Sequence, residues 1–384
     1  MSLSSVILFV EFEDANQLQP KAAVAHSSSA LRVRFVVAQT RRSPGWCKMV
    51  ASAILSNVSV ATVGYGKKYS HMRRLFWVME YIEEEGLQDR DIIVSYDGSD
   101  TLLTGALTVQ RALKKFIATT APTVDAFDAE AVRRGDATAP LLFTAEGNCY
   151  HPQLSENVKW GVSKGRCISL YKRAEMNALG QKGAEAGGRR KRLHFLNAGG
   201  YVARVWALKR AFTAYRSLMG LKRWWCDQSA WGMLYLWSIT QNSSSANEAR
   251  IPYGIVSLDF QNTFFLSVHG MRLGKDIMLW SSTSVAEIVE GGRLPFPLFF
   301  NIDGIPDATP AILHMNGVGR KDRVVLEENL RGHTSWFVEA NRTPEALHAA
   351  KDLLQNGALL DLHGVSGETK RIPFGDVCRG IDLI

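Results

Sequence analysis

Short apolar runs alternate along the chain with segments of helical periodicity. A run rich in β-branched and aromatic residues at 32–38 precedes a helical segment at 46–55, and a run at 58–63 precedes apolar positions of helical spacing at 72–82. Short apolar runs are typical of buried strands, and apolar positions three or four residues apart are typical of a helix that packs on one face. The pattern therefore predicts strand, helix, strand and helix in this order.

The same alternation continues through the middle of the chain. Further strands are predicted at 91–96 and 141–144, and further helices at 106–117, 205–219 and 230–237. Alternating strands and helices favour an α/β sandwich with a mostly parallel central sheet flanked by helices.

Composition divides the chain into three parts. Residues 1–30 form an N-terminal extension, 31–330 the main domain, and 331–384 a tail with a helix start at Thr343-Pro344-Glu345 and a strand at 358–362. The main domain carries a basic, glycine-rich insertion at about 178–192, predicted to be mobile, and a polar loop at about 241–249. The pattern leaves open whether the tail is a separate module or the edge of the same domain.

Charge and hydropathy narrow the classes of partner. The 384 residues carry a formal net charge of +8 and are 46% hydrophobic. A basic balance allows an acidic partner such as a nucleotide diphosphate, a nucleic acid or an anionic surface. No run reaches the roughly 20 apolar residues of a bilayer helix, so no membrane contact is expected.

The cysteines indicate a reducing environment. Five of them, odd in number and without a C-x-x-C pair, argue against a disulfide scaffold or a zinc ribbon. With no signal peptide recognised, the prediction is a cytoplasmic or nuclear protein. The five are Cys47, Cys149, Cys167, Cys226 and Cys378.

Two carboxylates directly after a buried strand are the first candidates for chemistry. Asp97 and Asp100 follow the apolar run at 92–94 within Asp97-Gly98-Ser99-Asp100. Carboxylate oxygens suit Mg²⁺ and Mn²⁺, and a neutral imidazole suits Mn²⁺ as a further ligand. The alternative is that one carboxylate only caps the turn or the following helix.

Several further segments follow in a fixed order. They include A-E-G-N-C at 145–149, L-N-A-G-G at 196–200, D-Q at 227–228 and H-M-N-G at 314–317. Together with the strand ends near 33–40 and 62–66, this order resembles the glycosyltransferase domain of the procollagen lysyl hydroxylases, which has the GT-A fold. The resemblance spans about residues 32–320 and implies a GT-A-like nucleotide-sugar-binding sandwich.

The resemblance assigns roles to individual residues. It implies that a UDP-sugar is the donor and that Mn²⁺, with Mg²⁺ as the alternative, is the cofactor. The metal ligands would be Asp97, Asp100 and His314; the residues at the nucleotide-sugar would be Thr40, Tyr65, Gly199, Gly200, Asn316 and Gly317; and the catalytic residues would be Asn197 and Asp227.

Some of these residues also have ordinary structural interpretations. Asp227 could be the N-cap of the following helix, and the two glycines could serve only a turn or a bulge. The sequence also departs from the family, with Cys226 before Asp227 in place of an acidic residue and Tyr150 in place of Trp. The acceptor therefore stays open.

Three functions are compatible with these residues. The first is transfer of a hexose from a UDP-sugar to a hydroxyl acceptor, of the hydroxylysine type or another. The alternatives are glucosylation of a hydroxymethylated DNA base, which needs basic contacts to phosphates and an extruded base, and a non-catalytic nucleotide-sugar-binding protein.

Overall fold

The structure is a computed structural model of the chain, and its described residues fall in ten segments. Residues 1–29, most of the predicted extension, lie outside the description, as do the predicted insertion at 178–192 and the predicted loop at 241–249. The described segments are 30–155, 167–172, 193–221, 223–240, 250–271, 300–302, 305–317, 320–364, 369–381 and residue 384.

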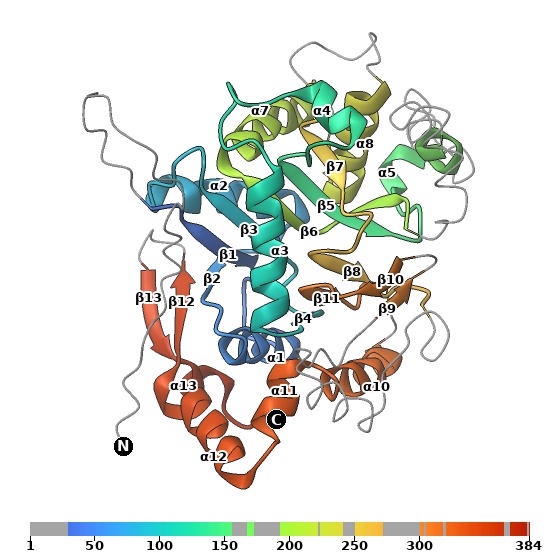
Figure 1. The fold of residues 1–384 in the computed structure, drawn as a ribbon. Helices are drawn as coiled ribbons and strands as arrows, with labels where there is room; N and C mark the ends of the chain where they lie inside the picture. Colours follow the sequence, from blue (N-terminus) through green and yellow to red (C-terminus); the bar gives the residue numbers. More distant parts are fainter. Residues whose placement is uncertain are drawn as a thin grey trace, which may run out of the picture.

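A large central sheet organises the molecule (Figure 1). Four of its seven pairs of neighbouring strands are parallel, and only β6 and β13 run opposite to the other strands. The predicted α/β fold with a mostly parallel sheet is confirmed. In spatial order the strands are β13 (Thr369–Pro373), β12 (Leu359–His363), β2 (Val60–Val63), β1 (Val33–Ala38), β3 (Ile92–Tyr96), β6 (Phe195–Arg204), β5 (Leu141–Glu146) and β7 (Val256–Leu258).

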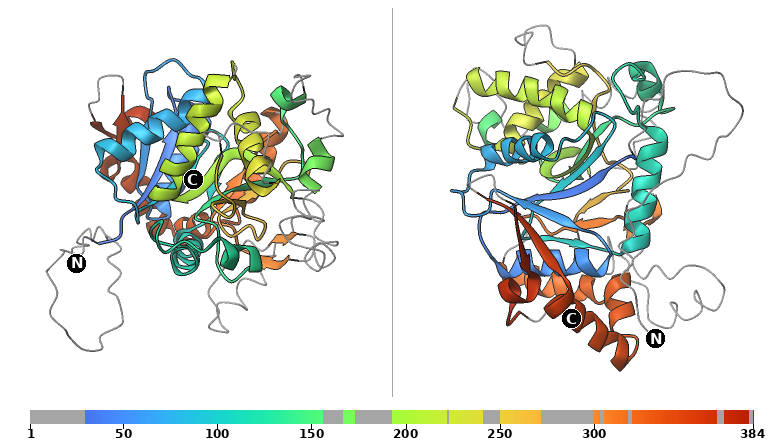
Figure 2. Two further views of the ribbon diagram at one scale, coloured as in Figure 1. Left: turned by 90° about the horizontal axis from the view of Figure 1, so that it is seen from above. Right: turned by 90° about the vertical axis from the view of Figure 1, so that its left-hand side faces the viewer.

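Helices cover both faces of this sheet, as the views from above and from the side show (Figure 2). Alternate residues of β1 point to opposite faces, so that Val36 joins one buried cluster while Phe35 and Val37 join the other. The first cluster includes α2 (Arg74–Glu84), α7 (Val205–Leu221) and α8 (Asp227–Thr240); the second includes α1 (Pro44–Leu55) and α3 (Ala106–Thr119).

A second, smaller sheet lies beside the first. Strand β11 (Ile312–His314) is its centre and pairs antiparallel with β4 (Thr101–Leu103) and parallel with β8 (Phe265–Ser267). The sequence pattern did not predict these strands, because three residues are too few to show a periodicity. Their pairing brings the end of β11 beside Asp100.

The remaining elements are short, apart from α10 with 12 residues. No described helix combines the length and the apolar character needed to cross a bilayer. These elements are η1 (His71–Arg73), α4 (Ala129–Arg134), α5 (Pro152–Ser155), β9 (Phe300–Ile302), β10 (Ile305–Ala308), α10 (Arg320–Arg331), α11 (Ser335–Ala340), α12 (Pro344–Asp352), η3 (Leu353–Gly357) and α13 (Phe374–Cys378).

The C-terminal segment extends the central sheet. Strand β12 pairs in parallel with β2, and the backbone N–H of Tyr65 donates to the carbonyl of His363 at 3.3 Å. Strands β12 and β13 lie at the sheet edge in two of the views (Figures 1 and 2). Strands β12 and β13 therefore build the edge of the sheet, next to the strand that Tyr65 follows.

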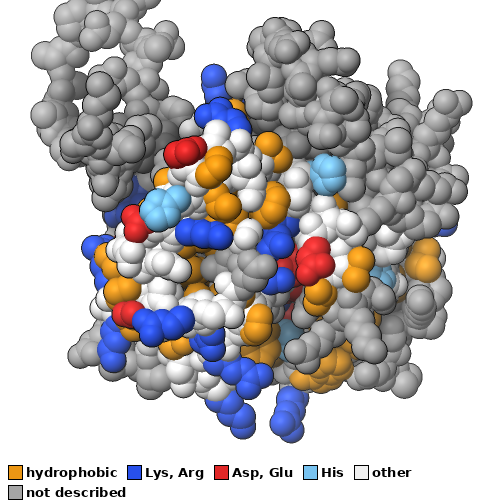
Figure 3. Space-filling view, turned by 90° about the horizontal axis from the view of Figure 1, so that it is seen from below, with side chains coloured by type: hydrophobic (Ala, Val, Ile, Leu, Met, Phe, Trp, Pro, Cys, Tyr) orange, Lys and Arg blue, Asp and Glu red, His pale blue; other side chains and the backbone are white. Residues whose placement is uncertain are grey.

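The face of the molecule that lies at the bottom of Figure 1 is chemically mixed. Basic, acidic and apolar side chains are interspersed over it (Figure 3). A cavity of about 570 Å³ lies between η3 and α13, with Leu354 and Phe374 among its apolar residues and Lys351 and Arg379 among its charged ones.

The prediction that the cysteines stay unpaired is wrong. Cys47 forms a disulfide with Cys378 and Cys149 with Cys167, and only Cys226 is free. The first pair is separated by 331 residues, so the tertiary fold sets this pairing and the spacing of cysteines cannot reveal it. Because disulfides persist in oxidising environments, the argument from cysteines to a reducing compartment no longer holds.

We expect the replacement Cys378→Ser to destabilise the fold strongly. The Cys47–Cys378 bridge closes a loop of more than 300 residues and ties α13 to α1. Loss of a native disulfide typically lowers the free energy of unfolding by about 2–5 kcal/mol. Urea unfolding under non-reducing conditions measures this, with the unpaired Cys226→Ala as control. Equal stability of Cys378→Ser and the parent protein would contradict a bridge at this position.

Candidate functional site

Three adjacent parallel strands end at one edge of the central sheet. Thr40 follows β1, Tyr65 follows β2 and Asp97 follows β3. The carbonyl of Thr40 accepts a hydrogen bond from the backbone N–H of Gly66 at 2.8 Å, so the first two turns are in contact. In open α/β sheets ligands bind at the carboxyl ends of the strands, where Thr40 and Tyr65 lie.

Asp97, Asp100 and His314 converge at this edge. Asp97 follows the last residue of β3, and its backbone N–H donates to the carbonyl of Gly199 at 2.8 Å. Asp100 precedes β4, whose Thr101 is paired with His314 on β11. The backbone N–H of Met315 donates to the carbonyl of Asp100 at 2.8 Å, which fixes His314 beside the two carboxylates.

The side chains of this group have unused ligand atoms. One potential ligand atom from each residue lies within 4.8 Å of the others. Nε2 of His314 is 3.6 Å from Oδ2 of Asp97 and 3.7 Å from Oδ1 of Asp100. Among the described residues neither ring nitrogen of His314 nor Oδ1 of Asp100 has a hydrogen-bond partner, although all three atoms are buried.

Unpartnered buried polar atoms are costly, and a cation would satisfy them. Two carboxylates and an imidazole are a donor set that fits Mn²⁺, and the carboxylates alone would suit Mg²⁺. The residues that sequence analysis predicted as metal ligands are therefore brought together in an arrangement that fits a divalent cation.

The two carboxylates also set the protonation of His314 when no cation is bound. Burial lowers the pKa of His314, but the Asp100 and Asp97 carboxylates outweigh burial and raise this pKa to about 10. Burial raises the pKa of Asp97, but Arg74 and His314 outweigh it and lower the value to about 2. Without a cation the imidazole therefore holds a proton between carboxylates, and a bound metal must displace that proton.

Gly199 lies against the metal-ligand group. Strand β6 shifts register against β5 between Phe143 and Thr144, which leaves residues 198–200 as a bulge. A Cβ on Gly199 would lie 2.2 Å from Cε1 of His314 and 2.8 Å from Oδ2 of Asp97. The bulge and the absence of a side chain let the strand approach the carboxylates closely.

Gly200 has different neighbours. A Cβ on it would lie 2.6 Å from Oγ1 of Thr144 and 2.8 Å from the ring of Phe265. A larger side chain at this position would clash with Thr144 and Phe265, which explains the glycine by packing alone. Its contact with the nucleotide-sugar stays a prediction. Gly317 has a φ of +65°, and a Cβ on it would lie 2.4 Å from Nδ1 of His269.

Glu146 is the centre of a buried polar network that sequence analysis did not assign. It ends β5, is 2% exposed, and accepts hydrogen bonds from the side-chain amides of Asn197 at 3.1 Å, Gln228 at 2.7 Å and Asn316 at 2.7 Å. Burial raises its pKa to about 7, against the lowering effect of these hydrogen bonds. Its position within A-E-G-N-C was the available signal.

The network joins two predicted residues to each other. Oδ1 of Asn197 also accepts from the backbone N–H of Gly199 at 2.7 Å, and Oδ1 of Asn316 accepts from Ser267 at 2.7 Å. Glu146 therefore links the predicted residues Asn197 and Asn316 beside the metal-ligand group.

Arg74 is the second residue that sequence analysis missed. It begins α2, and its guanidinium donates to Asp97, to Oδ2 of Asp227 at 2.9 and 2.6 Å, and to the carbonyl of Ala198 at 3.3 Å. Asp227 begins α8 and is 7% exposed. Asp227 is the first residue of α8 and accepts from the backbone N–H of Gln228, which is not the bond of an N-cap, and it is ion-paired next to the metal-ligand group.

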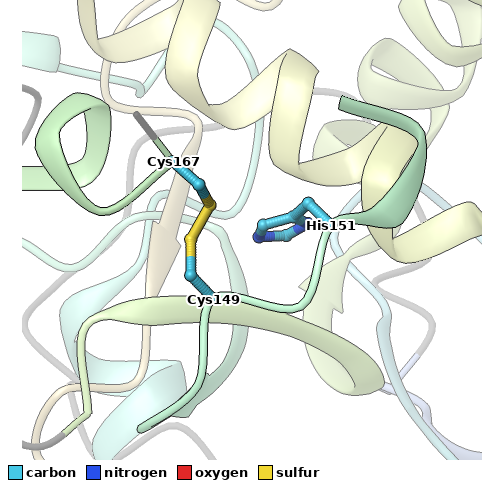
Figure 4. A group of neighbouring side chains, drawn as sticks. All are labelled: Cys149, His151 and Cys167. Atoms are coloured by element: carbon cyan, nitrogen blue, oxygen red, sulfur yellow. A yellow bond between two sulfur atoms is a disulfide. The ribbon is translucent and has the colours of Figure 1, made fainter. Parts of the chain in front are cut away.

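A second cluster of potential ligands lies behind the network (Figure 4). Cys149 and Cys167 form a disulfide, and the ring of His151 lies beside it. Nδ1 of His151 donates to the carbonyl of Gln228 at 3.0 Å, and Nε2 accepts from the hydroxyl of Tyr171 at 2.9 Å. Burial lowers the pKa of His151 to about 4, so this neutral ring supports Gln228 and the disulfide occupies both sulfurs.

Comparison with known proteins gives no match by sequence and a distant likeness to solved structures. No protein-family model and no curated protein matches the sequence. Among solved structures, the apo structure of WbbM, a bifunctional glycosyltransferase, is similar to this chain at 11% identity and a TM-score of 0.34, over 85% of this chain and 54% of that one. The chain thus spans about half the length of that structure, and the likeness to the procollagen lysyl hydroxylases rests on the motifs alone.

Proposed function

We propose that this protein is a metal-dependent glycosyltransferase that moves a hexose from a UDP-sugar to a hydroxyl acceptor. The observation that carries this proposal is the convergence of Asp97, Asp100 and His314, with buried ligand atoms that have no hydrogen-bond partner among the described residues. They would hold Mn²⁺, or Mg²⁺ as the alternative. A bound cation supplies neutralisation of the charge on a leaving diphosphate.

The neighbouring residues have proposed roles in donor binding. Thr40 and Tyr65 would lie beside the nucleotide, because Thr40 follows β1, the parallel neighbour of the strand that delivers Asp97, and Tyr65 follows β2, the next strand beyond β1. Asn197, held by Glu146, and Gly199 would face the donor sugar. Gly200, Asn316 and Gly317 are proposed as further donor contacts.

The reaction would form one bond at the anomeric carbon, break another there, and move one proton to a base. The acceptor oxygen attacks the anomeric carbon and loses its proton to a base, while the bond from that carbon to the diphosphate breaks and UDP leaves with the electron pair. Asp227 is the proposed base, but both its oxygens already accept hydrogen bonds, from Gln228 N–H and from Arg74. It would have to exchange one of these partners for the acceptor hydroxyl.

UDP release from a panel of UDP-sugars, with Mn²⁺ or with EDTA, tests the proposal. We expect release that requires the metal and is lost in the Asp97→Ala/Asp100→Ala protein. The matched control is Asp136→Ala, which removes an exposed carboxylate paired with Arg134. Acceptors should include hydroxylysine peptides and hydroxymethylated DNA.

Two results would change the assignment. UDP binding that is indifferent to EDTA and to the double replacement would contradict a metal site at these residues. Metal-dependent UDP-sugar binding without turnover on any acceptor, and without slow hydrolysis, would instead favour a non-catalytic nucleotide-sugar-binding protein.

A further inference from the structure

Arg74 occupies an unusual position for a cation. It is the first residue of α2, and the first turn of this helix has no acidic residue. The N-terminus of a helix carries partial positive charge, so a guanidinium there is unfavourable unless carboxylates are supplied from elsewhere. The Arg74 side chain is only 14% exposed, which increases this need for partners.

Two carboxylates from distant segments meet that need. Asp97, at the end of β3, accepts through Oδ1, and Asp227, at the start of α8, accepts two N–H donors through Oδ2. The carbonyl of Ala198, in the bulge of β6, accepts a further hydrogen bond. A planar guanidinium with several donors can hold these groups in one geometry, which a lysine cannot do.

The two oxygens of the Asp97 carboxylate have different neighbours. Oδ1 is taken by Arg74, whereas Oδ2 lies 3.6 Å from Nε2 of His314. Fixing one oxygen orients the other toward His314 and Asp100. Groups that hold a metal ligand in this way typically contribute 10- to 100-fold to metal affinity.

We propose that Arg74 is a positioning residue that orients Asp97 for the divalent cation and ties the start of α8 to the metal centre through Asp227. This inference rests on the proposed function, because it takes Asp97, Asp100 and His314 as the metal ligands. A second effect opposes it, since a cation next to the site also repels Mn²⁺. Orientation and repulsion predict opposite signs for the loss of Arg74.

Mn²⁺ affinity of the full chain, measured by calorimetry and by electron paramagnetic resonance without nucleotide, separates the two effects. We expect Arg74→Gln to weaken Mn²⁺ binding by about 10- to 100-fold, and Arg74→Lys to weaken it at least as much, because lysine keeps the repelling charge without the planar fork. Asp227→Asn removes the other anchor of Arg74 and should give a smaller loss than Arg74→Gln. The control is Arg133→Gln, which breaks the exposed pair with Glu130 and should change nothing.

Folding is checked by circular dichroism and by thermal unfolding in EDTA. Unchanged or tighter Mn²⁺ binding in folded Arg74→Gln, or in Arg74→Lys if the first variant does not fold, would overturn the positioning role while leaving the metal site intact. Absence of Mn²⁺ binding in the parent protein would overturn both the metal site and this inference.

Discussion

Replacement of Gly199 by alanine is expected to weaken Mn²⁺ binding strongly. The added Cβ would lie 2.2 Å from Cε1 of His314, and 2.8 Å from both Oδ1 of Asn197 and Oδ2 of Asp97. His314 is 2% exposed and has no space to retreat, so either the ring or the β6 bulge must move. We expect metal affinity to fall by on the order of 100-fold and stability by about 1–3 kcal/mol.

Gly220→Ala is the matched control for this experiment. Gly220 lies in α7, and a Cβ there would meet nothing within 4 Å. Alanine in a helix is favoured over glycine by about 0.5–1 kcal/mol, so this variant should be slightly stabilised and should bind Mn²⁺ normally. Normal Mn²⁺ affinity in Gly199→Ala would show that the cation binds elsewhere.

Glu146→Gln should remove a pH dependence from the stability of the metal-free protein. Burial raises the pKa of Glu146 from 4.5 to about 7. Between these values the native carboxyl keeps a proton that the unfolded chain has released, so the free energy of unfolding contributed by Glu146 falls as pH rises. At about 1.4 kcal/mol per pH unit, Glu146 contributes about 3 kcal/mol to the free energy of unfolding at low pH. This contribution is lost once the pH is above about 7.

The glutamine side chain resembles the protonated acid and does not titrate. The free energy of unfolding of this variant should therefore lack the fall with rising pH that Glu146 causes. Denaturant unfolding in EDTA from pH 4 to pH 8 measures the difference between the parent and Glu146→Gln, in which the other titrating groups cancel. We expect the variant to gain about 3 kcal/mol relative to the parent over this range. The control Glu130→Gln removes an exposed carboxylate and should track the parent. A parent and a Glu146→Gln variant with parallel profiles would mean that the carboxyl titrates normally.

Local patterns in the sequence were enough for the regular elements. The strands at 33–38 and 92–96 and the helices at 74–84 and 205–221 agree with the predicted segments within two residues or so, because long apolar runs and helical spacing are local signals. The α/β class followed from their alternation. The three-residue strand that carries His314 left no such signal, and only its pairing with β4 places the imidazole beside Asp100.

Candidate ligands could be named from the chain, but their geometry could not. Asp97 and Asp100 stand together in the sequence, whereas Arg74 and Glu146 gave no sign of their partners, which come from other strands and helices. The pairing of Cys47 with Cys378 was also invisible, since 331 residues separate them.

By itself the sequence determined the α/β class, five of the eight strands of the central sheet with several of the helices, and the chemical types of residue available to a metal and a nucleotide-sugar. The tertiary structure decided which of these residues meet, which atoms remain without partners, and which cysteines pair. The physical reason is that periodicity and propensity act over a few neighbouring residues. Contacts between distant segments depend on strand register and helix packing, which no local pattern encodes.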